Sequence, residues 1–130
     1  MTDKVADASA IAAILFLEPG YEAVEQALSG CELYAPALIR FELANVCLKK
    51  IKRRPTERDA ILEAFISFAD FGVREKEVDF AEAIQLAEAA QLSLYDATYL
   101  WLAENKDAEL VTLDKRLNDA LHSLRASPPA

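Results

Sequence analysis

The chain has 130 residues and a formal net charge of −8, with 14 basic and 22 acidic side chains. This length suits one domain with a proper core, so we expect a single domain over residues 1–130 with a frayed tail from about residue 125. A hydrophobic fraction of 53% excludes a disordered chain, and only three glycines and five prolines favour a helix-rich protein. The negative charge argues against a general nucleic-acid binder, because such domains are mostly basic.

The first half of the chain predicts two buried strands, each followed by helices. In chain order we expect a strand at 4–7, helices at 8–17 and 21–28, a strand at 31–35 that Pro36 ends, and a helix at 38–51. In this last helix the apolar residues at helical spacing should point into the core. They are Phe41, Ala44, Leu48 and Ile51.

The second half continues the alternation of helices and strands. We expect a helix capped by Thr56, a strand at 71–74, a helix beginning at Asp79, another beginning at Leu94, a strand at 109–113 and a helix at 115–121. Strands that alternate with helices indicate a parallel sheet covered on both faces. The predicted fold class is therefore α/β, with three α/β/α layers around a central, mostly parallel sheet of four to five strands.

The two cysteines and the apolar stretch near the start of the chain indicate the cellular compartment of the protein. Cys31 and Cys47 follow no metal-binding or redox spacing, so we interpret them as reduced, buried thiols. Reduced thiols are typical of an intracellular protein, and we expect a cytoplasmic one. The apolar stretch at 8–17 lacks a cleavage site and is too short to span a bilayer, which predicts no contact with a membrane.

Four acidic residues lie beside the ends of the predicted elements. Asp7 directly follows the first strand and Asp114 the last, and the carboxyl ends of parallel strands meet at one edge of a sheet. Glu42 lies on the helix at 38–51, and Asp96 lies in the first turn of the helix that follows Ser93. Together they predict one shared site. Clustered carboxylates repel each other unless a cation joins them, and oxygen ligands without Cys or His suit Mg²⁺ or Mn²⁺ rather than Zn²⁺.

Each acid also has an ordinary structural explanation. Asp7 and Asp114 both precede helices and can serve only as N-caps. Asp96 can serve only as the capping-box partner of Ser93, and Glu42 can be a solvated helix residue.

Several polar and aromatic residues are weaker candidates. Ser9 and Thr112 either cap helices or hydrogen-bond a site carboxylate, and Asn45, one turn after Glu42, either supports it or is solvated. His122 is the only histidine and should lie on the surface, which excludes a mechanism with a histidine pair. Three aromatic residues at helical spacing fit the core or a subunit interface better than a base-stacking platform. They are Tyr95, Tyr99 and Trp101.

A basic patch follows Glu42 on the same predicted helix. It consists of Lys49, Lys50, Lys52, Arg53 and Arg54. The patch either contacts RNA phosphates or is simply a solvated helix end.

Four segments of the chain resemble the signature segments of PIN-domain proteins. They are VADASAIAAIL at 5–15, FELANVCLKK at 41–50, LSLYDATYLWLA at 92–103 and LVTLDKRL at 110–117. The resemblance covers nearly the whole chain in the right order. It is greatest to the VapC-type toxin ribonucleases of prokaryotic toxin–antitoxin pairs, and it implies a PIN-like α/β/α domain.

The resemblance also implies an activity and a site. The activity is metal-dependent endoribonuclease cleavage, in which a metal-activated water hydrolyses RNA phosphodiester bonds. Asp7, Glu42, Asp96 and Asp114 would hold one or two Mg²⁺ or Mn²⁺ ions, with Asp7 and Asp96 as direct ligands. Ser9 and Thr112 would hydrogen-bond a carboxylate or a metal-bound water.

The resemblance further implies three partners. They are an RNA substrate, a cognate antitoxin that covers the acidic site, and a second copy of the chain in a homodimer. The broad apolar face around Ile61–Phe71 fits a partner or dimer surface.

Two alternatives come from other classes of protein. One is a non-catalytic scaffold that keeps the fold and binds a protein. The other is a receiver-like signalling domain that binds Mg²⁺, which needs an acidic pair after the first strand. Here a single Asp7 is followed by Ala8 and Ser9, so the receiver pattern fits poorly.

Overall fold

A computed structural model describes residues 2–126 of the chain. Within this range, four strands form one sheet in the order β3–β2–β1–β4. The strands are β1 (Asp3–Ala6), β2 (Glu32–Pro36), β3 (Arg74–Lys76) and β4 (Glu109–Val111). β1 pairs with β2 and β4, and β2 pairs with β3, all in parallel. The predicted parallel sheet is confirmed, with four strands.

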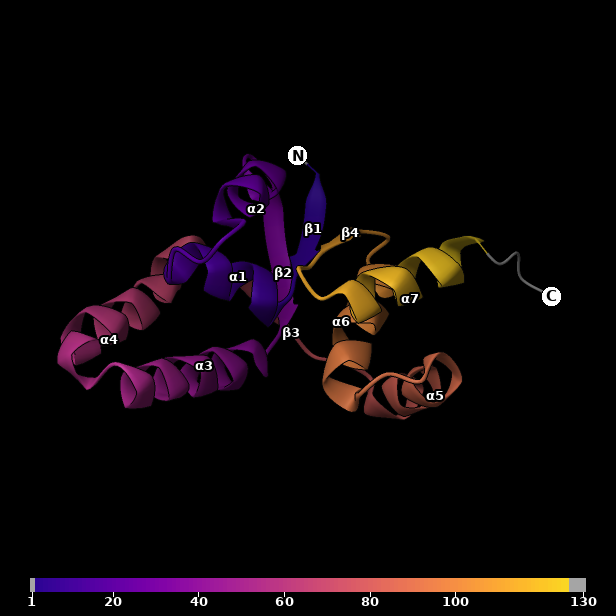
Figure 1. Cartoon of the computed structure of the whole chain (residues 1–130). Coiled ribbons are helices and arrows are strands. Elements are labelled where there is room, and N and C mark those ends of the chain that lie inside the picture. Colours follow the sequence, from indigo (N-terminus) through magenta and orange to yellow (C-terminus); the bar gives the residue numbers. More distant parts are fainter. Residues whose placement is uncertain (1, 127–130) are drawn as a thin grey trace.

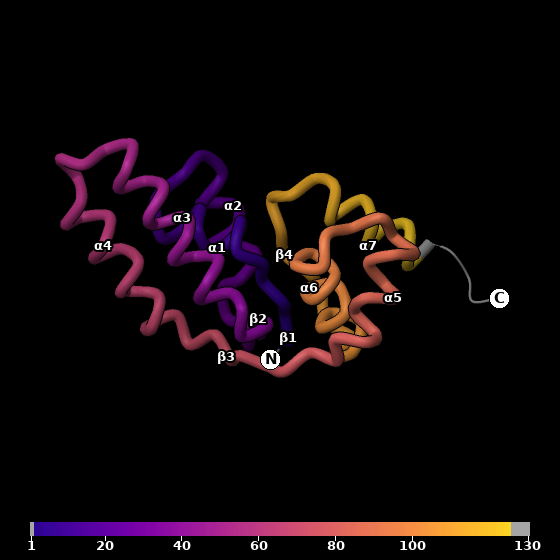
Figure 2. Tube along the Cα trace, turned by 90° about the horizontal axis from the view of Figure 1, so that it is seen from below, coloured from indigo at the N-terminus to yellow at the C-terminus, as the bar shows by residue number. Residues whose placement is uncertain are grey.

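Seven α-helices surround this sheet in the described residues. They are α1 (Ala8–Leu15), α2 (Tyr21–Leu28), α3 (Ile39–Arg53), α4 (Arg58–Ile66), α5 (Phe80–Ala90), α6 (Leu94–Asn105) and α7 (Lys115–Ala126). In Figure 1 and in the perpendicular view of Figure 2, α1–α4 lie on one side of the sheet and α5–α7 on the other. The three-layer α/β/α architecture is therefore confirmed.

The core lies on both faces of the central strands. Val5 and Ala6 of β1 have no exposed surface, and Ile11 of α1 and Leu100 of α6 are also completely buried. Where a parallel strand is covered on both faces it needs apolar side chains, which explains the fully buried Val5-Ala6 pair before Asp7. Asp3 and Lys4, at the start of β1, are only half-buried.

The helix starts follow the predicted capping residues at three places. Asp7, Asp79 and Ser93 each accept a hydrogen bond from the backbone N–H three residues later, at 3.0, 3.1 and 3.1 Å. A side-chain oxygen at this position satisfies an N–H group that has no partner within the helix.

Three predicted boundaries are wrong. Thr56 does not cap a helix, because Pro55–Glu57 forms a 3₁₀ turn and α4 begins after it without a side-chain cap. The strand expected at 71–74 lies at 74–76, because a second 3₁₀ turn, Ser67–Phe71, and the left-handed Gly72 (φ +70°) occupy the chain before it. Pro36 is the last residue of β2 rather than the residue after it.

The predicted inward face of α3 is also wrong. Phe41 is 74% exposed, Leu48 is 49% exposed and Ala44 is exposed. The buried residues of α3 are Ile39, Leu43 and Cys47. The helix carries two apolar stripes, and its packing against α1 and α4 buries the second one. Of the first stripe, Ile51 is half-buried and the other three residues are exposed.

α7 extends further than expected. It continues through Ala126, and Arg125 donates to Glu104 at 3.2 Å and to the carbonyl oxygen of Ala108 at 2.9 Å. The frayed tail that we expected from residue 125 therefore does not begin there, and its part at 127–130 lies outside the described residues. No helix between residues 2 and 126 is long and apolar enough to cross a membrane.

Candidate active site

Asp7 lies at the carboxyl end of β1 and is only 5% exposed. Its Oδ1 accepts hydrogen bonds from the Ser9 hydroxyl at 2.7 Å and from the Ala10 N–H at 3.0 Å. Its Oδ2 accepts one from the Thr112 hydroxyl. Asp7 is therefore an N-cap, but the two hydroxyls fix its carboxylate more firmly than capping requires. A carboxylate offers about four acceptor positions, so about one stays free.

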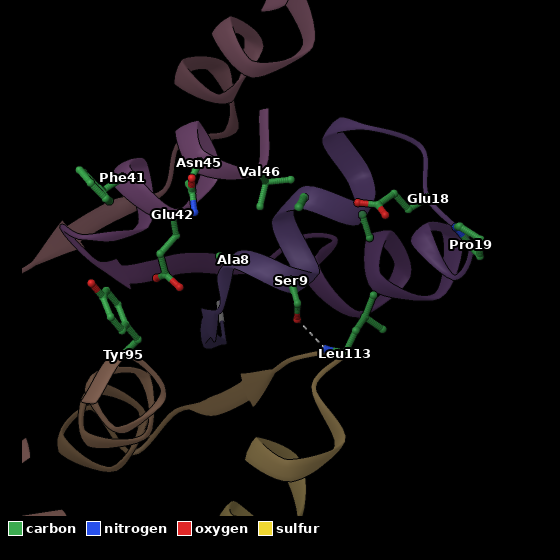
Figure 3. A pocket seen from close by; sticks show the side chains of 12 residues that line it. Ala8, Ser9, Glu18, Pro19, Phe41, Glu42, Asn45, Val46, Tyr95 and Leu113 are labelled. Atoms are coloured by element: carbon green, nitrogen blue, oxygen red, sulfur yellow. Dashed lines mark hydrogen bonds between the residues drawn. The ribbon is translucent and has the colours of Figure 1, made fainter. Parts of the chain in front are cut away.

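Ser9 and Thr112 join the two ends of the chain. The Ser9 Oγ accepts the N–H of Leu113 at 3.0 Å, a bond drawn in Figure 3. The Thr112 Oγ1 accepts the N–H of Asp114 at 2.9 Å. The hydrogen bonds to a carboxylate that we expected for Ser9 and Thr112 are thus present. They hold the turn after β4 against the start of α1.

Asp114 is the N-cap of α7. Its Oδ1 accepts the N–H groups of Arg116 at 2.9 Å and of Leu117 at 3.3 Å. No residue in the described range hydrogen-bonds its Oδ2. The capping explanation is correct for Asp114, and one oxygen remains available.

Glu42 and Asp96 come from two helices on opposite sides of the sheet. The Tyr99 hydroxyl, which is buried, donates to Glu42 Oε1 at 2.7 Å. The Asp96 carboxylate makes no hydrogen bond within residues 2–126, and only its backbone N–H bonds to Ser93. The capping box expected for Ser93 and Asp96 is therefore half formed. Sequence reasoning missed Tyr99, although its spacing of three residues from Asp96 places both on one helix face.

The four acids affect each other electrostatically. Burial raises the pKa of Asp7, Glu42 and Asp96, and neighbouring carboxylates raise them further. Asp7 is influenced by Asp114, Glu42 by Asp7 and Asp96, and Asp96 by Asp114 and Asp7. The hydrogen bonds to Asp7 and Glu42 described above oppose their shifts, and the nearby Ser93 hydroxyl opposes that of Asp96. Four segments of the chain thus bring their carboxylates into one cluster, which we call the carboxylate cluster.

Little positive charge compensates this cluster. Across the described residues, none of its four members forms an ion pair. The guanidinium of Arg116, in the first turn of α7, lowers the pKa of Asp96 and is the one basic group that acts on these shifts. Sequence reasoning did not single out Arg116, whose only signal is its position two residues after Asp114.

The donor set of the cluster fits a hard divalent cation. Its ligands would be carboxylate and hydroxyl oxygens, which Mg²⁺ and Mn²⁺ prefer. The one histidine of the chain, His122, is exposed on α7 and does not belong to the cluster. In the part of the chain described, no three acidic, histidine or cysteine side chains are gathered closely enough to hold an ion between them. Mg²⁺ usually binds through one or two carboxylates and keeps several waters, so an open arrangement of this kind suits it.

A pocket of about 630 Å³ lies beside the cluster. Alanines of α1 and Ser9 line one wall, and α3 supplies Glu42 and Asn45. Figure 3 shows Glu42 directed toward α6, which contributes Tyr95. Tyr95 is 54% exposed and does not enter the core, whereas Tyr99 of the same helix does.

The basic patch is divided by its contacts. Lys50 pairs with Glu18 at 3.5 Å and its Nζ lies 5.3 Å from the centre of the Phe16 ring. Arg54 pairs with Glu57 at 3.7 Å. Lys49, Lys52 and Arg53 are exposed, without an ion pair in the described structure. Lys49 follows Glu42 by seven residues, so it lies on nearly the same helix face, about 10 Å further along α3.

The family model of the PIN domain matches residues 4–121 of this chain. The chain belongs to the PIN domain family, which disfavours the receiver-like alternative.

Among characterised relatives, the chain is similar to Ribonuclease VapC3 from Pyrobaculum aerophilum. The two are 34% identical over 125 residues, which cover 92% of this chain and 95% of the relative. The fold is also similar to the crystal structure of PAE2754 from the same organism. The TM-score is 0.73 at 22% identity, and the match covers 96% of this chain and 95% of that one.

Proposed function

We propose that this protein is an endoribonuclease of the VapC type that depends on Mg²⁺ or Mn²⁺. The observation that carries the proposal is the carboxylate cluster. Four acids meet there without an ion pair among the described residues, and each lies in one of the segments that resemble the family signatures. The similarity to a named ribonuclease supports RNA as the substrate.

The free acceptor positions support a division of roles among the acids. Asp96 makes no side-chain hydrogen bond within residues 2–126, and Asp7 keeps about one free position, so these two would hold the cation. Glu42 Oε2 and Asp114 Oδ2 would assist or hold a second ion. When bound, the cation supplies a Lewis acid that stabilises the charge that develops on the phosphate.

The chain's own residues would position the groups and move the proton. Ser9 and Thr112 keep Asp7 in one orientation, and Tyr99 keeps Glu42 in one orientation. Glu42 would be the proton acceptor for the attacking water, because burial raises the pKa of its carboxylate and Asp96 would be held by the cation. Water adds to phosphorus and the bond to the 3′ oxygen breaks. The products would be a 5′-phosphate and a 3′-hydroxyl.

Cleavage of total RNA by the purified protein tests this proposal. With Mg²⁺ or Mn²⁺ we expect discrete fragments that carry 5′-phosphates, and a chelator or Asp96→Asn should abolish them. Asp59→Asn is the matched control, because Asp59 lies on α4 outside the cluster, with a side chain that is 94% exposed. Fragments that persist in Asp96→Asn, or that carry cyclic 2′,3′-phosphates, would contradict the mechanism.

The unpaired part of the basic patch would bind the RNA backbone. We propose this role for Lys49, Lys52 and Arg53, with Lys49 nearest to the cluster along α3. Each phosphate contact with a single strand contributes a slope of roughly 0.7 to the dependence of log affinity on log salt concentration. Replacing Lys49 and Arg53 by alanine should therefore lower the slope by about 1 to 1.5. An unchanged slope would show that Lys49 and Arg53 do not contact RNA phosphates.

We also propose two protein partners, a cognate antitoxin and a second copy of the chain. A cognate antitoxin would cover the carboxylate cluster, because an acidic site suits an Arg or Lys that a partner donates. A homodimer would use the apolar face of α4, which has no buried residue and where Ile66 is 62% exposed. Light scattering that gives a monomer at micromolar concentration would contradict the dimer.

We further propose a single functional domain in the cytoplasm, which suits an RNA substrate and the two free cysteines.

A further inference from the structure

Two aromatic side chains border the carboxylate cluster in an unusual way. Phe41 and Tyr95 are 74% and 54% exposed, although aromatic side chains of this size are normally covered. Each immediately precedes an acid of the cluster in the sequence, Phe41 before Glu42 and Tyr95 before Asp96. They come from different helices, α3 and α6, and both line the same pocket. We call this pair the aromatic rim.

The pocket that the aromatic rim borders has the size of a ligand site and one wall of small side chains. Its volume of about 630 Å³ lies in the range of small-ligand sites. Ala8, Ala12 and Ala13 give α1 a wall of small side chains along the pocket. At the aromatic end, Figure 3 shows Phe41, Glu42 and Tyr95, while Glu18 and Pro19 lie toward the other end.

Asn45 adds a polar group next to the rim. It follows Phe41 by four residues, so the two side chains are neighbours on the surface of α3. Asn45 is exposed, it lines the pocket, and no hydrogen bond occupies its amide in the described structure. An amide can donate and accept at once, which matches the edge of a nucleobase.

We propose that Phe41 and Tyr95 stack against unpaired RNA bases next to the scissile phosphate, and that Asn45 hydrogen-bonds the edge of one of these bases. This inference rests on the proposed ribonuclease function. If the cluster cuts a phosphodiester, the adjoining nucleotides must lie over the residues that border the cluster, and two of these residues are exposed rings. Proteins commonly recognise single-stranded RNA by stacking splayed bases on aromatic side chains.

The chemistry favours a base over a phosphate at the rim. The aromatic rings carry no charge that would attract a phosphate, and the carboxylates beside them attract one only through a bound cation. The bases present flat, neutral faces, and stacking on a ring tolerates any base. The rings would therefore supply affinity for RNA, while Asn45 would supply a preference for particular bases. The role of the rim is therefore to orient the chain of RNA so that one phosphate reaches the carboxylates.

Binding of short RNA tests the rim separately from cleavage. The Asp96→Asn protein with Mg²⁺ serves as the parent, so that the RNA stays intact, and fluorescein-labelled eight-nucleotide oligouridylate and oligoadenylate serve as probes. Phe41→Ala and Tyr95→Ala should each weaken binding roughly 5- to 100-fold. Phe41→Trp and Tyr95→Phe, which keep a ring, should retain binding. Phe80→Ala is the matched control, because Phe80 is 56% exposed on α5 and does not line this pocket.

Two further readouts distinguish stacking from other effects. The ring variants should leave the salt dependence of binding unchanged, whereas Lys49→Ala should reduce it, because only a charged contact releases counterions. A probe with abasic sugars should bind the parent weakly and show no further loss in the ring variants. In the protein with Asp96 intact, the ring variants should raise KM more than they lower kcat.

The outcomes separate the two proposals. If the parent binds both octamers and the ring variants bind equally well, the rim does not contact RNA and the inference is wrong, while the ribonuclease stands. Equal losses with the abasic probe would also overturn the inference, and would indicate an apolar surface for a protein instead. If the parent binds neither octamer and the unmodified chain cuts no RNA, both the function and the inference fail.

Discussion

Asp7 and Asp96 belong to the same carboxylate cluster, yet the chain holds them in different ways. Asp7 is almost completely buried and accepts three hydrogen bonds, from Ser9, Ala10 and Thr112. Asp96 is partly exposed, and its carboxylate has no hydrogen-bond partner among residues 2–126. Glu42 is intermediate, with one bond from Tyr99.

This difference follows from the elements that carry the acids. Asp7 and Asp114 follow neighbouring parallel strands, so the register of β1 and β4 fixes both backbone positions. Glu42 and Asp96 project from helices on opposite sides of the sheet, and their carboxylates influence each other electrostatically. The cluster therefore has a half at the strand ends that hydrogen bonds and strand register hold in place, which we call the rigid half. The half between α3 and α6 has fewer hydrogen bonds, and we call it the adjustable half.

The largest difference between the halves should appear when each acid is truncated. Asp7→Ala and Asp96→Ala should both reduce cleavage by about 100-fold or more. Asp7→Ala should also destabilise the fold by about 2 kcal/mol, because it removes an N-cap and the acceptor of two hydroxyls. Asp96→Ala should leave stability unchanged or raise it slightly, because it relieves repulsion. Urea denaturation measures this contrast, and equal losses of stability would show that the two halves are not different.

Tyr99→Phe probes the one hydrogen bond in the adjustable half. It removes the hydroxyl that Glu42 accepts and should destabilise the fold by about 1–2 kcal/mol, because Glu42 is partly buried and loses its partner. In a double-mutant cycle with Glu42→Gln, the two substitutions should be strongly coupled in both stability and cleavage rate. Additive effects would mean that Tyr99 only fills the core.

The pH dependence of stability should show the repulsion within the cluster. The pKa values of Asp7, Glu42 and Asp96 are raised above their ordinary values of 3.8, 4.5 and 3.8. Between the ordinary and the raised values the folded chain binds more protons than the unfolded chain, so this contribution to stability falls as pH rises through that window. Above the raised values it stays constant.

Mg²⁺ should reverse this loss, because it compensates the ionised carboxylates. Urea denaturation between pH 4 and 8, with a chelator or with Mg²⁺, measures both effects. A contribution that instead rises with pH in the chelator, and disappears in Asp96→Asn, would contradict the electrostatics of the cluster.

The smallest expected effect distinguishes two neighbouring lysines of the basic patch. Lys50→Ala should cost less than about 1 kcal/mol of stability, because it removes a partly exposed ion pair with Glu18 and the cover of Phe16. It should leave RNA affinity nearly unchanged. Lys49→Ala should leave stability nearly unchanged and should weaken RNA binding. Equal behaviour of the two variants would remove the distinction between a structural and an RNA-facing half of the patch.

The rigid half of the cluster could be predicted from the sequence, and the adjustable half only in part. A parallel sheet brings the residues after its strands to one edge, so Asp7 and Asp114 follow from the strand pattern alone. Glu42 and Asp96 depended on the family resemblance, since each is an ordinary residue in an ordinary helix. The bond from Tyr99 to Glu42 joins residues 57 positions apart, and no local pattern encodes it.

The face of α3 shows why the fold itself was predicted better than its surfaces. Both stripes of this helix are apolar at helical spacing, so periodicity cannot choose between Leu43 and Phe41. Packing against α1 and α4 decides the choice and leaves Phe41 outside. Phe41, which periodicity places in the core, is therefore one of the two exposed rings of the aromatic rim.

The central position of β1 has a consequence for biosynthesis. β1 is synthesised before β4, but β4 is one of its two neighbours, and Glu109 of β4 pairs with Lys4. The Asp7 carboxylate likewise receives its bond from Thr112, 105 positions later. A nascent chain that lacks residues 109–114 has neither β4, the second neighbour of β1, nor Thr112 and Asp114 of the site. The carboxylate cluster is therefore complete only after β4 and the first residues that follow it have been synthesised.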